Sequence, residues 1–429
     1  MMSLPKVFIN QIQRFITNIA LLLISLALIF FVVEFSFRVF AHEYVEIVNF
    51  DKYFPKDLHP KLGTIFVPNT KIKWTNNLEF KVEQMSNSYG FLDYEHVLDK
   101  PAGVKRILII GDSFVEAAQV SLEQKFHVLL EKKLNATVSN QKYETIALGL
   151  SGYGTTNELA LYEELGRKFK PDLTIIVFVH NDFMNNSPVL EAFRNGWTPH
   201  YFPRLFYEKK ANGYVPIPVN MEWQKHLVNV DEPNGLLVPD AVFKWSYFYK
   251  WVMMPMKHKR ANELYYEKIR KRSLLLSKEN GYESVYNEIY SYGGSDFDKA
   301  FFKSELSPIF NEALAITDFS IKKFKKETLR DHSKLLFLIT ESCSMLPNKK
   351  GVKDFVDKGC AVKIRKILEH NKIQYYDLYD EFLKLGDPEE AHFKRDRHWN
   401  ATGHSWVADI LFSYVTENTS YLKAASMKN

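Results

Sequence analysis

The chain has 429 residues, of which 46% are hydrophobic, and a formal net charge of +5. This length and composition suit one large domain or two modest ones with a full hydrophobic core. The small net charge argues against a nucleic-acid-binding protein, and no zinc-finger spacing, RNA-recognition signature or basic region with heptads supports one.

An uncharged run of nineteen residues, Phe15–Val33, lies near the amino terminus. At about 1.5 Å per residue, a helix of this length just crosses a bilayer core of about 30 Å. A cleaved signal peptide and a buried soluble helix are the alternatives. The long run and the lack of a clear Ala-x-Ala site favour a membrane anchor. Basic residues lie on both sides, at Lys6, Arg14, Arg38 and Lys52, so the positive-inside rule gives no orientation.

The rest of the chain alternates between strand-like and helix-like segments. The expected strands are Arg106–Ile110, Tyr143–Ala147, Leu173–Val179, Lys334–Thr340 and Ile373–Leu378. The expected helices run over 121–134, 155–166, 308–330 and 352–369. This order predicts a three-layer α/β/α fold with a mainly parallel sheet, plus an N-terminal transmembrane helix and a helical insertion. The expected segments are an anchor (1–40), a connector (41–100), a first part of the α/β domain (101–186), an insertion (187–325) and a second part of the α/β domain (326–429).

The insertion contains a Pro-rich stretch at 199–239, an aromatic cluster at 243–251 and a basic run at Lys257–Arg272. Ligands of open α/β sheets bind outside the carboxyl ends of the strands, so an insertion leaving from such an end can roof the pocket. We expect the aromatic cluster to be buried, with sugar stacking and membrane contact as alternatives. The basic run is expected to be a solvated helix face, with anionic lipid or an acidic polysaccharide as alternative partners.

Residues suited to ester chemistry follow the first three predicted strands. Ser113, in Gly111-Asp112-Ser113, follows the first strand, Gly152 the second and Asn181 the third. Ser113 is the candidate nucleophile. The backbone N–H groups of Ser113 and Gly152 and the Asn181 amide are candidate donors to a developing oxyanion. Since these positions follow strand ends, one rim of one sheet can collect them.

The candidate base and its orienting carboxylate lie near the carboxyl end, in Asp396-Arg397-His398-Trp399. We expect His398 to take the proton of the nucleophile and Asp396 to orient it, with Asp387 as the alternative carboxylate. Each of these features alone is more often a turn, a helix cap or a structural residue. Their order and their places after strands favour a catalytic site.

These motifs resemble those of the SGNH/GDSL hydrolase superfamily, whose four blocks contribute Ser, Gly, Asn and His in that order. The matching blocks are Ile110–Ser113, Leu150–Gly154, His180–Asp182 and Asp396–His398. The resemblance covers roughly 106–186 and 334–415, and not the insertion. It implies ester hydrolysis through an acyl-serine, with no metal or organic cofactor. The chain also resembles membrane-anchored members at Glu34, Arg38 and the stretch Asn87–Phe91, which implies an extracytoplasmic domain.

Three departures from the superfamily pattern stand out. Val179 replaces a usual Gly, and His180 follows it. Leu92 replaces a familiar Arg after Gly-Phe. The last block has the spacing Asp-x-His rather than Asp-x-x-His and is followed by Trp399. This shorter form resembles proteins that O-acetylate alginate and related polysaccharides.

Three functions follow as hypotheses: an esterase acting on glycans, lipids or small esters, an O-acyltransferase modifying a cell-envelope polysaccharide, and a non-catalytic envelope or glycan-binding protein. Cys343 and Cys360 are expected either to form a disulfide in an oxidising compartment or to be unpaired thiols, with Cys360 facing the core. His180, His392 and His404 are expected to be mainly structural.

Overall fold

The computed structural model describes residues 6–48, 51–138, 141–197, 202–223, 245–291, 297–343 and 359–417. The chain divides into two compact units. One comprises 1–50 and 231–264, and the other comprises 51–230 and 265–429. Residues 199–201 and 224–239 of the Pro-rich stretch, and residues 243–244 of the aromatic cluster, lie outside the described residues.

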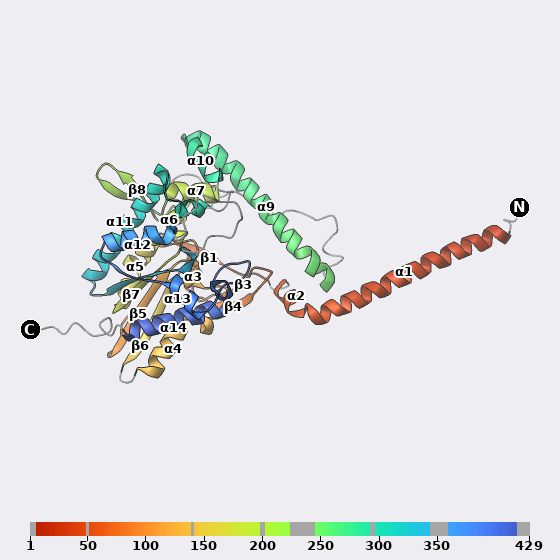
Figure 1. The fold of residues 1–429 in the computed structure, drawn as a ribbon, viewed down its shortest axis with the longest axis horizontal. Helices are drawn as coiled ribbons and strands as arrows, with labels where there is room; N and C mark the ends of the chain where they lie inside the picture. The colour runs from red at the N-terminus through yellow and green to blue at the C-terminus, as the bar shows by residue number, and fades with distance from the viewer. Residues whose placement is uncertain are drawn as a thin grey trace, which may run out of the picture. The chain divides into compact units, whose positions relative to one another are not determined.

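A five-stranded parallel sheet forms the centre of the larger unit (Figure 1). Its strands are β5 (Val104–Gly111), β6 (Lys142–Gly149), β7 (Leu173–Phe178), β10 (Lys334–Ile339) and β11 (Gln374–Asp377). They lie in the order β11-β10-β7-β5-β6, so the chain changes direction across the sheet between β5 and β7. The carboxyl ends of these two strands form the switch point at which open α/β sheets bind ligands. All five strands predicted from the sequence are therefore confirmed.

Side chains of the sheet alternate between two apolar clusters, one on each face. On β5, Leu108 and Ile110 belong to one cluster, and Ile107 and Ile109 to the other. The first face is covered by α5 (Thr155–Glu164), α11 (Pro308–Arg330) and α12 (Gly359–His370). The second face is covered by α4 (Phe126–Thr137), α13 (Leu378–Leu385) and α14 (Ala401–Glu417). The three-layer prediction is therefore confirmed.

The helix expected from Ser121 begins later than predicted. Ser121 and Gln124 form a capping box, but on a short 3₁₀ turn, Leu122–Gln124, that precedes α4. Lys125 separates the two with an extended backbone (ψ 140°). Its buried ammonium group donates to the carbonyls of Leu92 and Glu116, 2.6 and 2.7 Å away. Contacts distant in sequence thus set this helix start. Of the helix expected at 352–369, the residues before Gly359 lie outside the described part.

The connector contains strands that the sequence pattern did not predict. β1 (Lys56–His59) pairs antiparallel with β2 (Gly63–Phe66), and β3 (Lys71–Thr75) pairs antiparallel with β4 (Lys81–Met85). The connector's Phe66 is fully buried in the same apolar cluster as the first sheet face. Residues 51–100 are therefore packed into the α/β domain.

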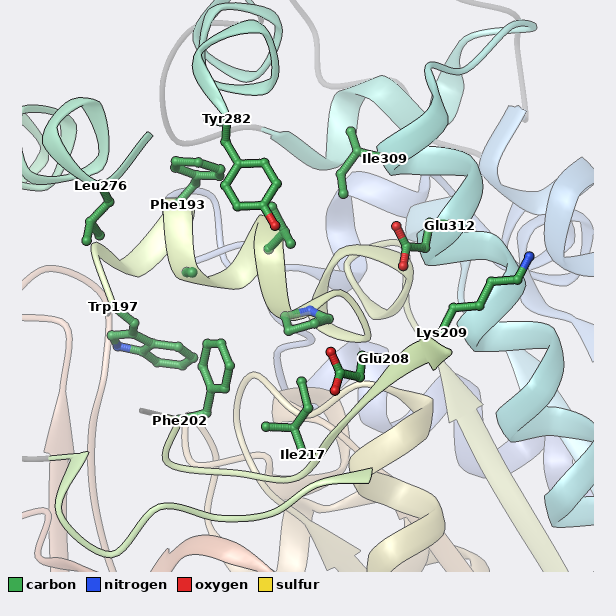
Figure 2. Close-up of a pocket in the computed structure, with 13 residues that line it drawn as sticks. Phe193, Trp197, Phe202, Glu208, Lys209, Ile217, Leu276, Tyr282, Ile309 and Glu312 are labelled. Carbon is green, nitrogen blue, oxygen red and sulfur yellow. The ribbon is translucent and has the colours of Figure 1, made fainter. Parts of the chain in front are cut away.

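The described part of the insertion within the larger unit is not wholly helical. It holds the helices α7 (Pro188–Asn195) and α10 (Glu283–Ser291), and the antiparallel hairpin of β8 (Phe206–Lys210) and β9 (Gly213–Ile217). Beside the helices of the expected helical insertion, this part contains a hairpin that the sequence pattern did not predict. A cavity of about 200 Å³ is lined in part by α7, the hairpin and α11, with Phe193, Trp197 and Phe202 among its lining residues (Figure 2).

The smaller unit pairs the end of the apolar helix α1 (Lys6–Phe40) with the start of α9 (Tyr247–Asn280). The Glu34 carboxylate accepts hydrogen bonds from Ser246 Oγ (2.7 Å) and from Tyr247 N (2.9 Å), at the first turn of α9. The short helix α2 (His42–Val48) follows α1. Among the described residues, one helix, within Asn10–Phe40, is long and apolar enough to span a membrane, with a mean hydropathy of 2.8. None of its most apolar eighteen-residue stretch is buried in the protein, so the membrane-span and signal-sequence interpretations remain and the buried-helix alternative gains no support.

The two cysteines lie in one apolar cluster. Cys343 and Cys360 are free and fully buried, and their sulfur atoms are 3.0 Å apart. The expectation that Cys360 faces the core is confirmed. The two thiols are also placed for pairing in an oxidising compartment, so both sequence interpretations fit this arrangement.

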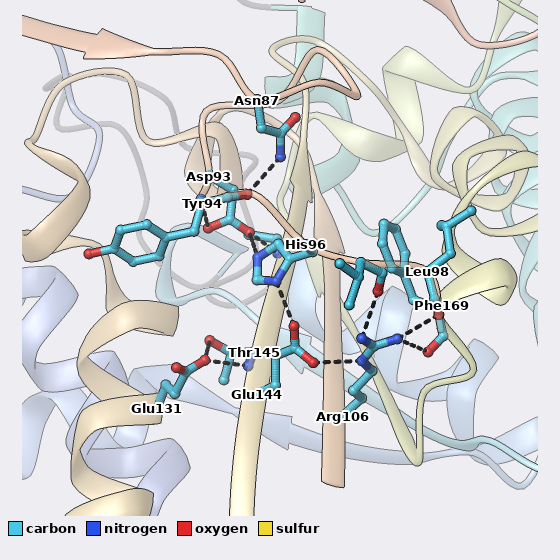
Figure 3. Close-up of polar contacts among 12 residues, drawn as sticks. Asn87, Asp93, Tyr94, His96, Leu98, Arg106, Glu131, Glu144, Thr145 and Phe169 are labelled. Atoms are coloured by element: carbon cyan, nitrogen blue, oxygen red, sulfur yellow. Dashed lines mark hydrogen bonds and ion pairs between the residues drawn. The ribbon is translucent and has the colours of Figure 1, made fainter. Parts of the chain in front are cut away.

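A buried polar network ties the end of the connector to β5 and β6 (Figure 3). Asp93 contacts Nε2 of His127 at 2.9 Å and Nε2 of His96 at 3.2 Å. The other ring nitrogen of His96 lies 2.8 Å from Glu144, which also accepts from Nε of the fully buried Arg106 at 2.6 Å. With a carboxylate at each ring nitrogen, His96 is best satisfied as a doubly protonated ring.

The network sets the charges of its members. Burial by itself would lower the pKa of His96, but the hydrogen bonds to Asp93 and Glu144 outweigh it and raise that pKa to about 9. Burial would raise the pKa of Asp93, but His127 and His96 hold it well below its usual range. The connector is thus fastened by charged hydrogen bonds as well as by apolar packing.

His96 is expected to make the free energy of unfolding depend on pH. Its pKa is raised from 6.5 to about 9 on folding, so its contribution is complete below pH 6.5 and is lost as pH rises through 9. The loss is on the order of 3 kcal/mol. Urea unfolding of the detergent-solubilised protein at pH 6, 7.5 and 9 measures it. His96→Gln should remove this decline, and a variant that keeps the full decline would contradict the assignment.

Candidate active site

Ser113 lies at the switch point of the sheet, at the start of the one-turn helix α3 (Ser113–Glu116). Asp112, between β5 and this helix, is its N-cap, and its side chain accepts from Phe114 N at 2.9 Å. The strand ends at Gly111, so the change from strand to helix is abrupt. The hydroxyl of Ser113 is thereby held at the carboxyl edge of the sheet.

The structure brings Ser113, His398 and Asp396 together. His398 Nε2 lies 2.7 Å from Ser113 Oγ, and His398 Nδ1 lies 2.6 Å from Asp396 Oδ1. Because Nδ1 faces a carboxylate, we assign the ring proton to Nδ1, which leaves Nε2 to accept the hydroxyl proton of Ser113. Phe114 packs against the imidazole with ring centroids 5.0 Å apart. The three side chains thus form one chain of hydrogen bonds.

The loop that carries Asp396 is held by the connector. Glu79, between β3 and β4, accepts from the backbone N–H groups of Arg395 and Asp396, each at 2.9 Å. Arg397 has a positive φ of 72°, which is uncommon for a residue with a side chain, and its guanidinium makes two hydrogen bonds to Glu389. These contacts fix the Asp-x-His turn. Asp387, the alternative carboxylate, instead caps the turn Pro388–Ala391.

The other histidines near this loop have structural partners. His392 Nε2 and Trp399 Nε1 both contact the buried Glu341 Oε1, at 2.7 and 2.8 Å. His404 Nδ1 accepts from Phe126 N at 3.3 Å. The indole of Trp399 is itself buried, so this residue anchors the His398 loop in the core.

The charge of His398 is set by its acidic surroundings. Burial would lower its pKa, but the hydrogen bond to Asp396 and the nearby charges of Asp112 and Glu116 outweigh this and raise the pKa above its usual value. About a quarter of the side chain is exposed, at 25%. The raised pKa makes His398 a stronger base than free imidazole.

The Asn181 amide points to the residue before Ser113. Its Nδ2 donates to Asp112 Oδ2 at 3.1 Å and to Asn185 Oδ1 at 2.7 Å. Both amide hydrogens of Asn181 are thus engaged within the protein. Burial raises the pKa of Asp112 in spite of hydrogen bonds from Phe114 N and Asn181.

Gly152 follows β6 on a loop that is tied to the Ser113 helix. Its positive φ of 76° is a conformation that residues with side chains avoid. Just before it, Ser151 donates from N and from Oγ to the buried Glu116 carboxylate, both at 2.7 Å. No sequence pattern singled out Glu116 or Ser151 for these contacts. The signal available was a carboxylate three residues after the candidate nucleophile, too common a pattern to be singled out.

The chain matches no protein-family model and no curated protein. Among solved structures it is similar to TesA (10% identity, covering 73% of this chain and 99% of that one, TM-score 0.35). It is also similar to a two-domain esterase (CEX) active on acetylated mannans (11% identity, covering 74% of this chain and 50% of that one, TM-score 0.35). The chain thus spans about half the length of that esterase. A third similar structure is that of Axe2, an acetylxylan esterase from Geobacillus stearothermophilus (12% identity, covering 73% of this chain and 93% of that one, TM-score 0.34).

Replacing Asp396 is expected to lower the pKa of His398. In the wild type the imidazole should titrate above 6.5. In Asp396→Asn the pKa should fall, because the carboxylate that stabilises the charged ring is lost. Histidine-selective NMR titration of the solubilised protein measures this. Asp387→Asn is the matched control and should leave the titration unchanged. A shift in the control rather than in Asp396→Asn would move the orienting role to Asp387.

Proposed function

We propose that the protein is a serine-dependent ester hydrolase that acts through an acyl-serine intermediate. The observation that carries this proposal is the hydrogen-bonded chain Asp396–His398–Ser113, with contacts of 2.6 and 2.7 Å, at the switch point of a parallel sheet. A nucleophile, a base and an orienting carboxylate in contact are what acyl transfer requires. The 2.7 Å approach of His398 to Ser113 also favours an enzyme over a non-catalytic protein on the same fold.

In the proposed reaction, Ser113 Oγ attacks the ester carbonyl carbon while its proton passes to His398 Nε2. The oxyanion accepts hydrogen bonds from the Ser113 and Gly152 N–H groups and from the Asn181 amide. His398 then gives its proton to the departing alcohol, leaving the acyl group on Ser113. A water molecule attacks the acyl carbon as His398 takes one of its protons. Collapse of the second tetrahedral intermediate releases the acid and returns that proton to Ser113.

The second candidate is O-acyl transfer to a cell-envelope polysaccharide, in which a sugar hydroxyl replaces water in the second step. It is favoured by the apolar helix α1 and by the Asp-x-His-Trp form of the last block. Both functions use the same residues and differ in whether the site excludes water from the acyl-serine. We infer further that α1 anchors the chain in a membrane with the α/β domain on the extracytoplasmic side, where glycan esters occur.

Ser113→Ala is expected to abolish ester hydrolysis while leaving the fold intact. The hydroxyl is the proposed nucleophile, and its loss costs little packing. Release of p-nitrophenol from p-nitrophenyl acetate by the detergent-solubilised protein should disappear in this variant, together with labelling by a fluorophosphonate. Ser413→Ala, at an exposed position on α14, is the control and should behave as wild type. Full turnover by Ser113→Ala would exclude this nucleophile. Labelling of Ser113 without p-nitrophenol release would instead favour the transferase.

Gly152→Ala is expected to reduce kcat about 10²-fold, because an L residue at φ 76° strains the loop and a loop shifted by about 1 Å misplaces its N–H. Gly103→Ala is the matched control. Gly103 has a similar φ of 75°, and a Cβ there would meet nothing within 4 Å. Steady-state kinetics with p-nitrophenyl acetate should show a loss in the first variant and not in the second. Equal kcat values would remove Gly152 from the mechanism.

A further inference from the structure

Arg204 is a buried cation in the insertion, just before β8. Its exposed fraction is 6%, and its Nη2 donates to the Glu191 carboxylate on α7. The guanidinium also lies 5.3 Å from the ring centroid of Trp197 and 5.7 Å from that of Phe206. Trp197 lines the apolar cavity of the insertion (Figure 2). Arg204 therefore sits between that apolar cluster and the edge of the sheet.

The guanidinium group of Arg204 packs against the Gly152 loop. A Cβ atom placed on Gly152 would lie 3.2 Å from Arg204 Nη1 and 4.0 Å from Nη2, with no other heavy atom from outside the loop within 4 Å. Within the described residues, Arg204 Nε is buried without a hydrogen-bond partner. The Gly152 backbone is therefore held against a charged, planar group, and its position depends on where that group is held.

The same ion pair also reaches the Asn181 amide. Glu191 Oε1 accepts from Asn185 Nδ2 at 3.0 Å, and Asn185 Oδ1 accepts from Asn181 Nδ2 at 2.7 Å. Glu191 and Asn185 are both fully buried or nearly so. Fixing Glu191 therefore fixes the direction of the Asn185 amide, which in turn orients Asn181.

We propose that Arg204, paired with Glu191, is a positioning residue that aligns the two oxyanion donors contributed by Gly152 and Asn181. The proposal rests on the proposed function, since it concerns donors to the oxyanion of that reaction. The insertion contributes both members of the pair, so it takes part in catalysis without supplying a reacting group. Loss of the cation would leave the buried Glu191 carboxylate with only the more distant Arg194 as a cation among the described residues, and the hydrogen bonds that orient Asn181 would rearrange.

The test compares Arg204→Ala and Arg204→Lys with Arg194→Ala. Arg194, on α7, is the matched control because its Nη1 also approaches Glu191, at 3.6 Å. Unlike Arg204, its side chain is 38% exposed to solvent. The solubilised full chain is assayed with p-nitrophenyl acetate and with the corresponding thionoester, in which sulfur replaces the carbonyl oxygen. Preorganised N–H donors stabilise the compact oxyanion better than the larger, weakly accepting sulfur anion.

Arg204→Ala is expected to lower kcat for the oxygen ester about 10²-fold, with little change in KM, because the donors are displaced by about 1 Å. The loss for the thionoester should be much smaller, so the ratio of the two kcat/KM values falls. Arg204→Lys should show the same change in weaker form, since an ammonium keeps the charge but not the planar contact with Gly152. Arg194→Ala should keep the wild-type ratio.

A purely structural role predicts a different result. If the Arg204 variants lose activity equally on both esters, in step with a lower Tm, the positioning role is overturned. Unchanged kcat in both variants overturns it as well. If Arg204→Ala does not fold, the ester ratio of Arg204→Lys decides alone. If the wild-type protein hydrolyses neither ester and is not labelled at Ser113, the proposed function itself is wrong. If the wild type is active and the Arg204 variants have the same kcat values and ester ratio, only the positioning role of Arg204 is wrong.

Discussion

The adjacency of the carboxyl ends of β5 and β7 is the constraint on which the proposed site depends. The strand order reverses between these two strands, so no crossover helix fills the space above them, and Ser113 and Asn181 meet there. The hydrogen bond from Asn181 to Asp112, at 3.1 Å, joins the two strand ends directly. Without this strand order, the hydroxyl of Ser113 and the Asn181 amide would not be neighbours at that edge.

The connector contributes to this edge although it carries none of the reacting groups. Glu79 holds the backbone of Asp396, and the Asp93 network fastens the connector to the sheet. Lys56 lies 3.7 Å from Glu116, the carboxylate that binds the loop before Gly152. The sequence predicts the connector only as a link between an anchor and a domain, but in the structure it supports the proposed site.

The insertion supports the other side. Its Arg204–Glu191 pair stands behind Gly152 and, through Asn185, behind Asn181. The connector acts on the proposed orienting carboxylate through Glu79 and, through Lys56 and Glu116, on the loop before Gly152. The insertion acts on both proposed oxyanion donors. The proposed reaction therefore depends on three parts of the chain that are far apart in sequence.

The sequence alone was sufficient for the five strands and for the candidate Ser113, Asn181 and His398, because apolar runs and the polar residues after them are local patterns. Asp396 was already the expected partner of His398, but the sequence left Asp387 open as an alternative. The start of α4 and the strands of the connector depend on contacts between distant residues. So do the roles of Glu79, Glu116 and Arg204. Each of these is a charged residue that finds its partner only when the chain is folded, and such pairings leave no local signal.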